Sequence, residues 1–112
     1  MDKIKKDINQ IREDIKEVDY KIAELFEKRM KYTAELAEAK KEIGAPIYDK
    51  NREDEKLADI TKNRSNPFIV KGLEEIFIQM MSISRKYQYH LVHQRDRYIE
   101  NYFTEVPELV MF

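Results

Sequence analysis

Hydrophobic residues recur every three or four positions along the first forty residues of the chain. The stretch from Ile4 to Ile43 contains neither glycine nor proline. Its apolar positions are Ile4, Ile8, Ile11, Ile15, Val18, Ile22, Leu25, Tyr32, Leu36 and Ala39. This spacing is the α-helical period and is close to a heptad repeat. The pattern therefore predicts one very long helix, which ends at Gly44 and Pro46.

Two further helices are predicted after this break. Asp49 is a good N-cap for a short helix that continues to about Lys62. In the next break, NRSNP, Ser65 or Asn66 caps a third helix and Pro67 takes its first helical position. The apolar residues of this third, long helix are Ile69, Leu73, Ile76, Phe77, Met80, Met81, Tyr87 and Leu91. The sequence thus predicts an all-α fold with one very long, one short and one long helix.

The first of these helices is too long to be buried by its own chain. At 1.5 Å per residue, ~38 residues make a rod of roughly 57 Å. A compact globule of this size has a radius of gyration of only about 13 Å. The apolar stripe of the rod must therefore be covered by a second copy or another partner, and we expect a homo-oligomer.

Composition narrows the class of protein. Lys and Arg number 21 against 22 for Asp and Glu, and no helix face is uniformly basic, so we expect no nucleic-acid partner. No segment approaches ~20 consecutive apolar residues and the first residues do not resemble a signal peptide, so we expect a cytoplasmic protein without membrane association. The chain has no cysteine, and His90 and His93 lack a convincing third ligand, so we expect no metal.

Two cations interrupt the apolar stripe of the long helix. Arg29 stands where the step from Leu25 calls for an apolar residue. Lys40 lies eleven positions later and only about 20° round the helix, with Leu36 between them on the same face. Buried cations without a partner are costly. We therefore expect an anionic group to meet Arg29 and Lys40.

Polar residues also interrupt the stripe of the third helix. Ser84 and Gln88 are one turn apart and offer a hydroxyl and an amide suited to orienting a small polar ligand. Arg12 differs, because it lies ~25 Å along the axis from Arg29 and about 100° off its face. One small ligand cannot touch both arginines of a straight helix, so a functional Arg12 would serve a site on a partner subunit.

Each of these features taken alone also has a structural explanation. An arginine on a long helix is usually solvated, a Ser or Gln on a core stripe often satisfies a neighbouring backbone group, and Asp-x-x-Arg-Glu after a proline is usually helix capping. Their order along one chain is more specific than any single one.

In that order the residues resemble the all-helical class of chorismate mutases. The resemblance rests on IREDIKEVDYKIAELFEKRMKYTAELAEAKKEIGAPIYDKNRE, followed by SISRKYQ. The matching residues are Arg12, Asp19, Arg29, Lys40, Pro46, Asp49, Arg52, Glu53, Ser84 and Gln88, within a match that spans residues 4–91. Lys16 departs from the pattern, since family members often have an acidic residue there.

The resemblance implies an intertwined dimer of three-helix chains with two active sites, each drawing residues from both subunits. It implies the rearrangement of chorismate to prephenate, a step toward phenylalanine and tyrosine. This one-step pericyclic shift needs no nucleophile, metal or cofactor. Catalysis must hold a flexible dianion in its compact conformer and stabilise charge on the breaking ether oxygen.

The resemblance also implies roles for the residues that contact the dianion. Arg29, with Arg12 of the other chain, is expected to grip the two carboxylates as a forked donor. Ser84 is expected to support one carboxylate. Lys40 and Gln88 are expected to donate to the ether oxygen.

The remaining roles concern the ring hydroxyl. Glu53, together with the backbone at Asp49, is expected to accept or position this hydroxyl, and Arg52 to add positive field near it. The expected catalytic residues are therefore Arg29, Lys40, Gln88 and Glu53, and the expected substrate-binding residues are Arg12, Arg29, Lys40, Asp49, Arg52, Glu53, Ser84 and Gln88.

The resemblance divides the chain into two parts. Residues 1–92 are expected to form the chorismate mutase domain. Residues 93–112 are expected to be a helical extension, continuing toward Tyr102 and stopped by Pro107, and a tail whose role is open.

Two alternative functions remain. One is a related helical lyase that removes pyruvate from isochorismate, although such proteins tend to lack the Arg52–Glu53 pair and a residue like Ser84. The other is a non-catalytic helical dimerisation module, in which Arg29 and Lys40 set the register of the seam.

Overall fold

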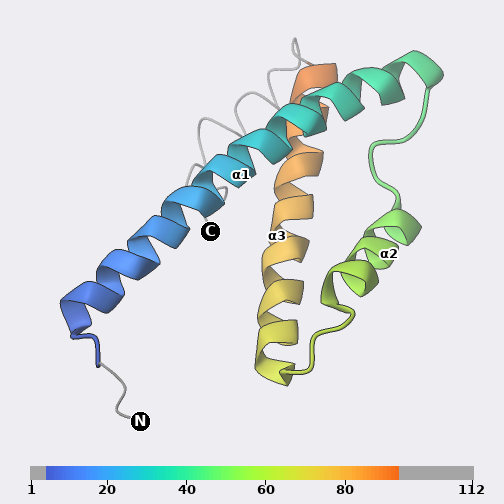
Figure 1. The fold of residues 1–112 in the computed structure, drawn as a ribbon. Helices are drawn as coiled ribbons and strands as arrows, with labels where there is room; N and C mark the ends of the chain where they lie inside the picture. The colour runs from blue at the N-terminus through green and yellow to red at the C-terminus, as the bar shows by residue number, and fades with distance from the viewer. Residues whose placement is uncertain (1–4, 94–112) are drawn as a thin grey trace. The chain divides into compact units, whose positions relative to one another are not determined.

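The computed structural model describes residues 5–93, and all its regular elements in this range are α-helices (Figure 1). Helix α1 is Ile8–Ile43, α2 is Lys50–Thr61 and α3 is Pro67–Val92, with 36, 12 and 26 residues. The predicted all-α class and the order of one very long, one short and one long helix are confirmed. The predicted continuation toward Tyr102 and the tail lie outside the described residues.

Helix α1 begins after an N-cap at Asp7. The backbone N–H of Gln10 donates to Asp7 Oδ1 at 2.8 Å, and the N–H of Ile11 donates to the Asp7 carbonyl at 3.1 Å. These are the bonds of an N-cap, which satisfies donors that have no partner within the helix. The cap at Asp7 therefore sets the start of α1, within the stretch whose apolar period was used to predict the helix.

The other end of α1 is closed by a glycine, as predicted. Gly44 has a φ of 69°, in the left-handed region that favours glycine. The N–H of Ala45 donates to the Lys40 carbonyl at 2.9 Å, and that of Gly44 to the Lys41 carbonyl at 3.4 Å. This pair of bonds is a Schellman motif, which ends the helix and turns the chain away.

Helices α2 and α3 begin at the predicted caps. Asp49 accepts a hydrogen bond from the Arg52 backbone N–H at 3.2 Å. Asn66 accepts from the N–H of Phe68 at 2.9 Å and of Ile69 at 3.4 Å, with Pro67 in the first turn. Of the two caps considered for α3, Asn66 is the one used.

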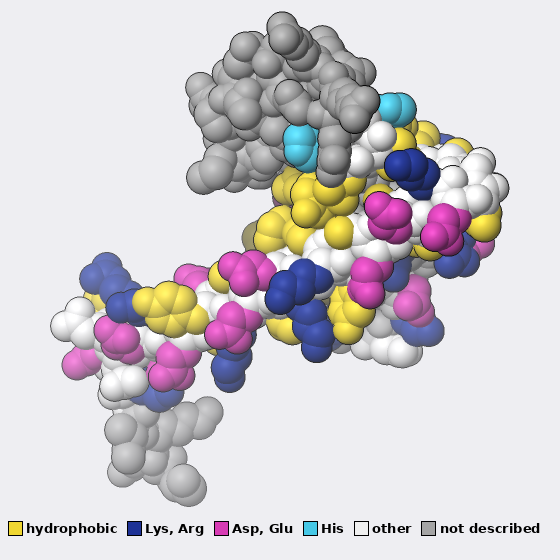
Figure 2. All heavy atoms as spheres, turned by 90° about the horizontal axis from the view of Figure 1, so that it is seen from above, with side chains coloured by type: hydrophobic (Ala, Val, Ile, Leu, Met, Phe, Trp, Pro, Cys, Tyr) yellow, Lys and Arg dark blue, Asp and Glu magenta, His cyan; other side chains and the backbone are white. Residues whose placement is uncertain are grey.

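The chain divides into two compact units after Tyr32. The first holds the N-terminal part of α1, whose apolar side chains are 45–65% exposed. These are Ile8, Ile11, Ile15, Val18, Ile22 and Leu25, here called the α1 apolar row. On the face drawn in Figure 2, acidic, basic and hydrophobic side chains are interspersed. A row this exposed is available for burial against another chain.

The second unit holds the last turns of α1 together with α2 and α3. Helix α2 packs against α3 but contributes no buried residue. Among the described residues, the buried positions are Thr33, Ala37, Met81, Ser84 and Gln88. Three of the five are polar, so this small core serves as more than apolar filling.

Candidate active site

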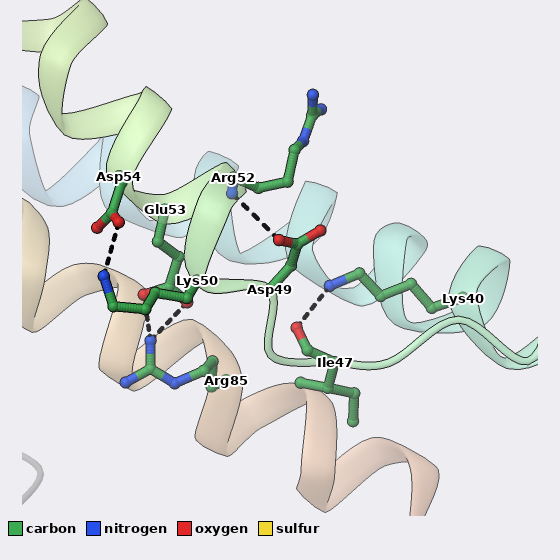
Figure 3. Close-up of polar contacts among 8 residues, drawn as sticks. All are labelled: Lys40, Ile47, Asp49, Lys50, Arg52, Glu53, Asp54 and Arg85. Atoms are coloured by element: carbon green, nitrogen blue, oxygen red, sulfur yellow. Dashed lines mark hydrogen bonds and ion pairs between the residues drawn. The ribbon is translucent and has the colours of Figure 1, made fainter.

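The end of α1, the loop after it, α2 and α3 bring charged side chains together in the second unit (Figure 3). Lys40, on the last turn of α1, donates from Nζ to the Ile47 carbonyl at 2.8 Å. An ammonium group has three donors. This bond fixes the direction of the side chain and uses one of them, leaving the others for a ligand.

Burial and neighbouring charges act on the pKa of Lys40 in opposite directions. Burial lowers the pKa of its ammonium group, while the charges of Asp49 and Glu53 act to raise it, with a net lowering. Desolvation strengthens electrostatic interactions, because fewer water molecules compete for the charge. Lys40 is thus a partly desolvated cation close to two carboxylates.

Glu53, on α2, is held by a partner on α3. Nη1 of Arg85, on α3, donates to both carboxylate oxygens of Glu53, each at 2.5 Å. The two side chains are 28% and 24% exposed, so the pair is partly shielded from water. Arg85 Cζ also lies 4.9 Å from the centre of the Tyr48 ring, a cation–π distance.

Ser84 and Gln88 occupy buried positions on one side of α3. Their exposed fractions are only 7% and 4%. Oε1 of Gln88 is buried and has no hydrogen-bond partner among the described residues. Leaving a buried polar group without a partner costs about 1–3 kcal/mol. Ser84 and Gln88 are thus buried polar side chains, which can orient a ligand through hydrogen bonds.

Arg52 is oriented differently from its neighbours in the sequence. Its side chain is 79% exposed and lies 3.8 Å from Glu55. In Figure 3 it points away from Lys40 and Glu53. Its backbone N–H is the group that Asp49 caps. Within this chain, Arg52 therefore contributes to the start of α2, and a contact with substrate stays a prediction.

Arg12 and Arg29 belong to the first unit. Arg12 is exposed, whereas Arg29 is half-buried. Burial lowers the pKa of the Arg29 guanidinium, as expected for a cation withdrawn from water. Neither residue lies in the unit that holds the Lys40–Glu53 cluster. Their part in the site stays a prediction.

The described residues also bear on metals and membranes. Between residues 5 and 93, no group of three or more His, Asp or Glu side chains is arranged to hold a metal ion. None of the three helices is both long enough and apolar enough to cross a bilayer.

A family comparison accounts for this arrangement. The model of the family chorismate mutase type II matches residues 11–89, which include every predicted site residue. The chain belongs to the type II chorismate mutases. It is accordingly an isomerase whose reaction is the conversion of chorismate to prephenate. The match lies inside the predicted domain of residues 1–92, whose bounds stay a prediction.

Two other comparisons give no relatives. Neither the curated proteins nor the solved structures contain a match to this chain of 112 residues.

Sequence reasoning missed three contributors to the cluster: Arg85, the Ile47 carbonyl and the Tyr48 ring. Arg85 lies one turn before Gln88 on α3. Its pairing with Glu53 joins two helices across 32 positions and has no signal in the local sequence. The backbone role of Ile47 has no signal in its side chain.

Proposed function

We propose that Lys40, Glu53, Ser84 and Gln88 of this mutase bind chorismate and promote its rearrangement to prephenate. The observation that carries the proposal is the Lys40 ammonium group. It is partly desolvated, aimed by its bond to the Ile47 carbonyl, and left with free donors. A donor of this kind suits an oxygen that gains negative charge as its bond breaks.

In this reaction the ether C–O bond breaks as a new C–C bond forms within one molecule. No proton, nucleophile or leaving group has to be handled. Lys40 and Gln88 donate to the ether oxygen, Ser84 supports a carboxylate, and Glu53 accepts from the ring hydroxyl. The site acts by holding the compact conformer and by matching the charge of the transition state.

The energies required are compatible with this set of contacts. A rate gain on the order of 10⁶ needs about 8 kcal/mol. A hydrogen bond to a charged group contributes roughly 1.5–3 kcal/mol. Three or four such bonds that strengthen in the transition state supply most of the requirement.

A second copy of the chain completes the site in this proposal. Arg29 and Arg12 of the other subunit bind the two carboxylates of the substrate. The exposed α1 apolar row supports such a dimer, because a row of this length needs a cover. We further infer that the protein works in the cytoplasm, in the synthesis of phenylalanine and tyrosine.

The experiment is to add purified protein to chorismate and follow the loss of its ultraviolet absorbance. Acid treatment should then convert the product to phenylpyruvate, which identifies prephenate. If chorismate were untouched and isochorismate released pyruvate, the protein would be the related lyase. Inactivity on both would support the dimerisation module instead.

A further inference from the structure

We infer that Arg85 is a positioning residue, which orients the Glu53 carboxylate toward the ring hydroxyl of the substrate, and that Tyr48 holds Arg85 in place. The inference rests on the proposed function. It goes beyond it by giving a role to a side chain outside the predicted site.

The first step is the form of the contact between the two residues. A single nitrogen, Nη1 of Arg85, bridges both oxygens of Glu53. This charge-assisted bridge to both oxygens holds the carboxylate group of Glu53 close to α3. Ionised carboxylates have about four acceptor positions. The bridge therefore leaves acceptor positions on Glu53 that can receive a hydroxyl.

The second step is the difference between this pair and ordinary ion pairs of the chain. Lys50–Asp54 and Lys62–Asp59 are within α2 or at its end, and their side chains are 57–72% exposed. Exposed pairs of this kind contribute little. Arg85–Glu53 instead joins α3 to α2 and is 24–28% exposed. Its geometry is thus set by packing between helices.

The third step concerns the loop between α1 and α2. Ile47, Tyr48 and Asp49 are consecutive, and each holds a different element. Ile47 accepts from Lys40, Tyr48 stacks with Arg85, and Asp49 caps α2. One short loop therefore sets the positions of both cations near Glu53: Lys40 from α1 and Arg85 from α3.

The test compares two inhibitors, both bicyclic ether dicarboxylates shaped like the transition state. One carries the ring hydroxyl, and the other has hydrogen in its place. For Arg85→Gln, inhibition by the hydroxyl-bearing compound should weaken about 10- to 100-fold, the equivalent of one charged hydrogen bond. Inhibition by the compound without the hydroxyl should change by less than about threefold.

Two further variants control for folding and for charge. Arg85→Lys keeps the charge but not the planar guanidinium that lies over the Tyr48 ring, and it should give an intermediate loss, again only with the hydroxyl. Lys71→Ala removes an exposed cation from α3 and should leave both inhibition constants unchanged. The helical signal in circular dichroism verifies that each variant is folded. If Arg85→Gln does not fold, the comparison of the two inhibitors is made with Arg85→Lys.

The outcomes separate this inference from the proposed function. Equal weakening of both inhibitors in a folded Arg85 variant would overturn the positioning role alone. No weakening of either would do the same. A wild-type protein that binds neither compound and leaves chorismate unchanged would overturn the proposed function, and the role of Arg85 with it.

Discussion

Lys40 and Lys41 are adjacent in the sequence but differ in exposure and in hydrogen bonding. Lys40 is half-buried and bonded to the Ile47 carbonyl, whereas the Lys41 side chain is exposed. Lys40→Ala should lower kcat/KM by roughly 100-fold or more, the usual effect of removing one donor to a developing oxyanion. Lys41→Ala should be nearly silent. Wild-type activity in Lys40→Ala would refute the assignment of Lys40 to the ether oxygen.

The pKa of Lys40 gives a second prediction at the same residue. Burial lowers it, so the ammonium donor is lost at a lower pH than for an ordinary lysine. The charge of Glu53 opposes this lowering. Glu53→Gln should therefore lower the pKa of Lys40 further. The alkaline limb of the kcat/KM profile reports groups of the free enzyme. In the activity that Glu53→Gln retains, this limb should lie at lower pH than in the wild type.

A profile of kcat/KM against pH for the wild type and Glu53→Gln measures this shift. Lys41→Ala serves as the control, and its limb should coincide with that of the wild type. A limb that stayed in place or moved to higher pH in Glu53→Gln would contradict the electrostatic link between the two side chains.

At the scale of one element, α2 depends on the residue that caps its N-terminus. Asp49 caps it by accepting from the Arg52 N–H. Asp49→Ala should cost about 0.5–2 kcal/mol of stability, because that donor loses its partner. Asp49→Asn keeps a side-chain acceptor and should remain close to the wild type. Thermal unfolding followed by circular dichroism compares the two, and equal losses would argue against the cap.

The elements themselves could largely be predicted, because their ends are set by local chemistry. Gly44, Asp49 and Pro67 act within a few residues of their own position, so the sequence around each is sufficient. The start of α1 could not be read from the apolar period, because that period includes Ile4, which precedes the cap at Asp7. The period describes which face is apolar and does not say where hydrogen bonding begins.

The candidate site was predictable only in part, because some of its contacts join residues that are far apart in the sequence. Ser84 and Gln88 were placed on one side of the third helix from their spacing alone, and both are buried. The partner of Glu53 could not be found that way. Arg85 is 32 positions away, and the two meet only because α2 packs on α3.

At the scale of the whole molecule, the proposed dimer has a direct test. Arg12→Ala and Arg29→Ala, each inactive alone, are unfolded together and refolded. Random pairing makes half the dimers mixed, and each mixed dimer has one intact site of two. Roughly a quarter of wild-type activity should therefore return. Absence of recovery, with mixed dimers shown to be present, would exclude shared sites.

Helix α2 carries two of the predicted site residues yet buries none of its own side chains. Segments with few buried contacts open locally at low free energy, well before the molecule unfolds. Amide hydrogens of α2 should therefore exchange with solvent faster than those of α3 in the free protein. A bound dianion that contacts Glu53 would require α2 to be folded, and it should therefore slow exchange in α2 most. If Glu53 binds the substrate as proposed, the helix that carries it is less stable than α3 in the free protein, and substrate binding supplies stability that the packing of α2 lacks.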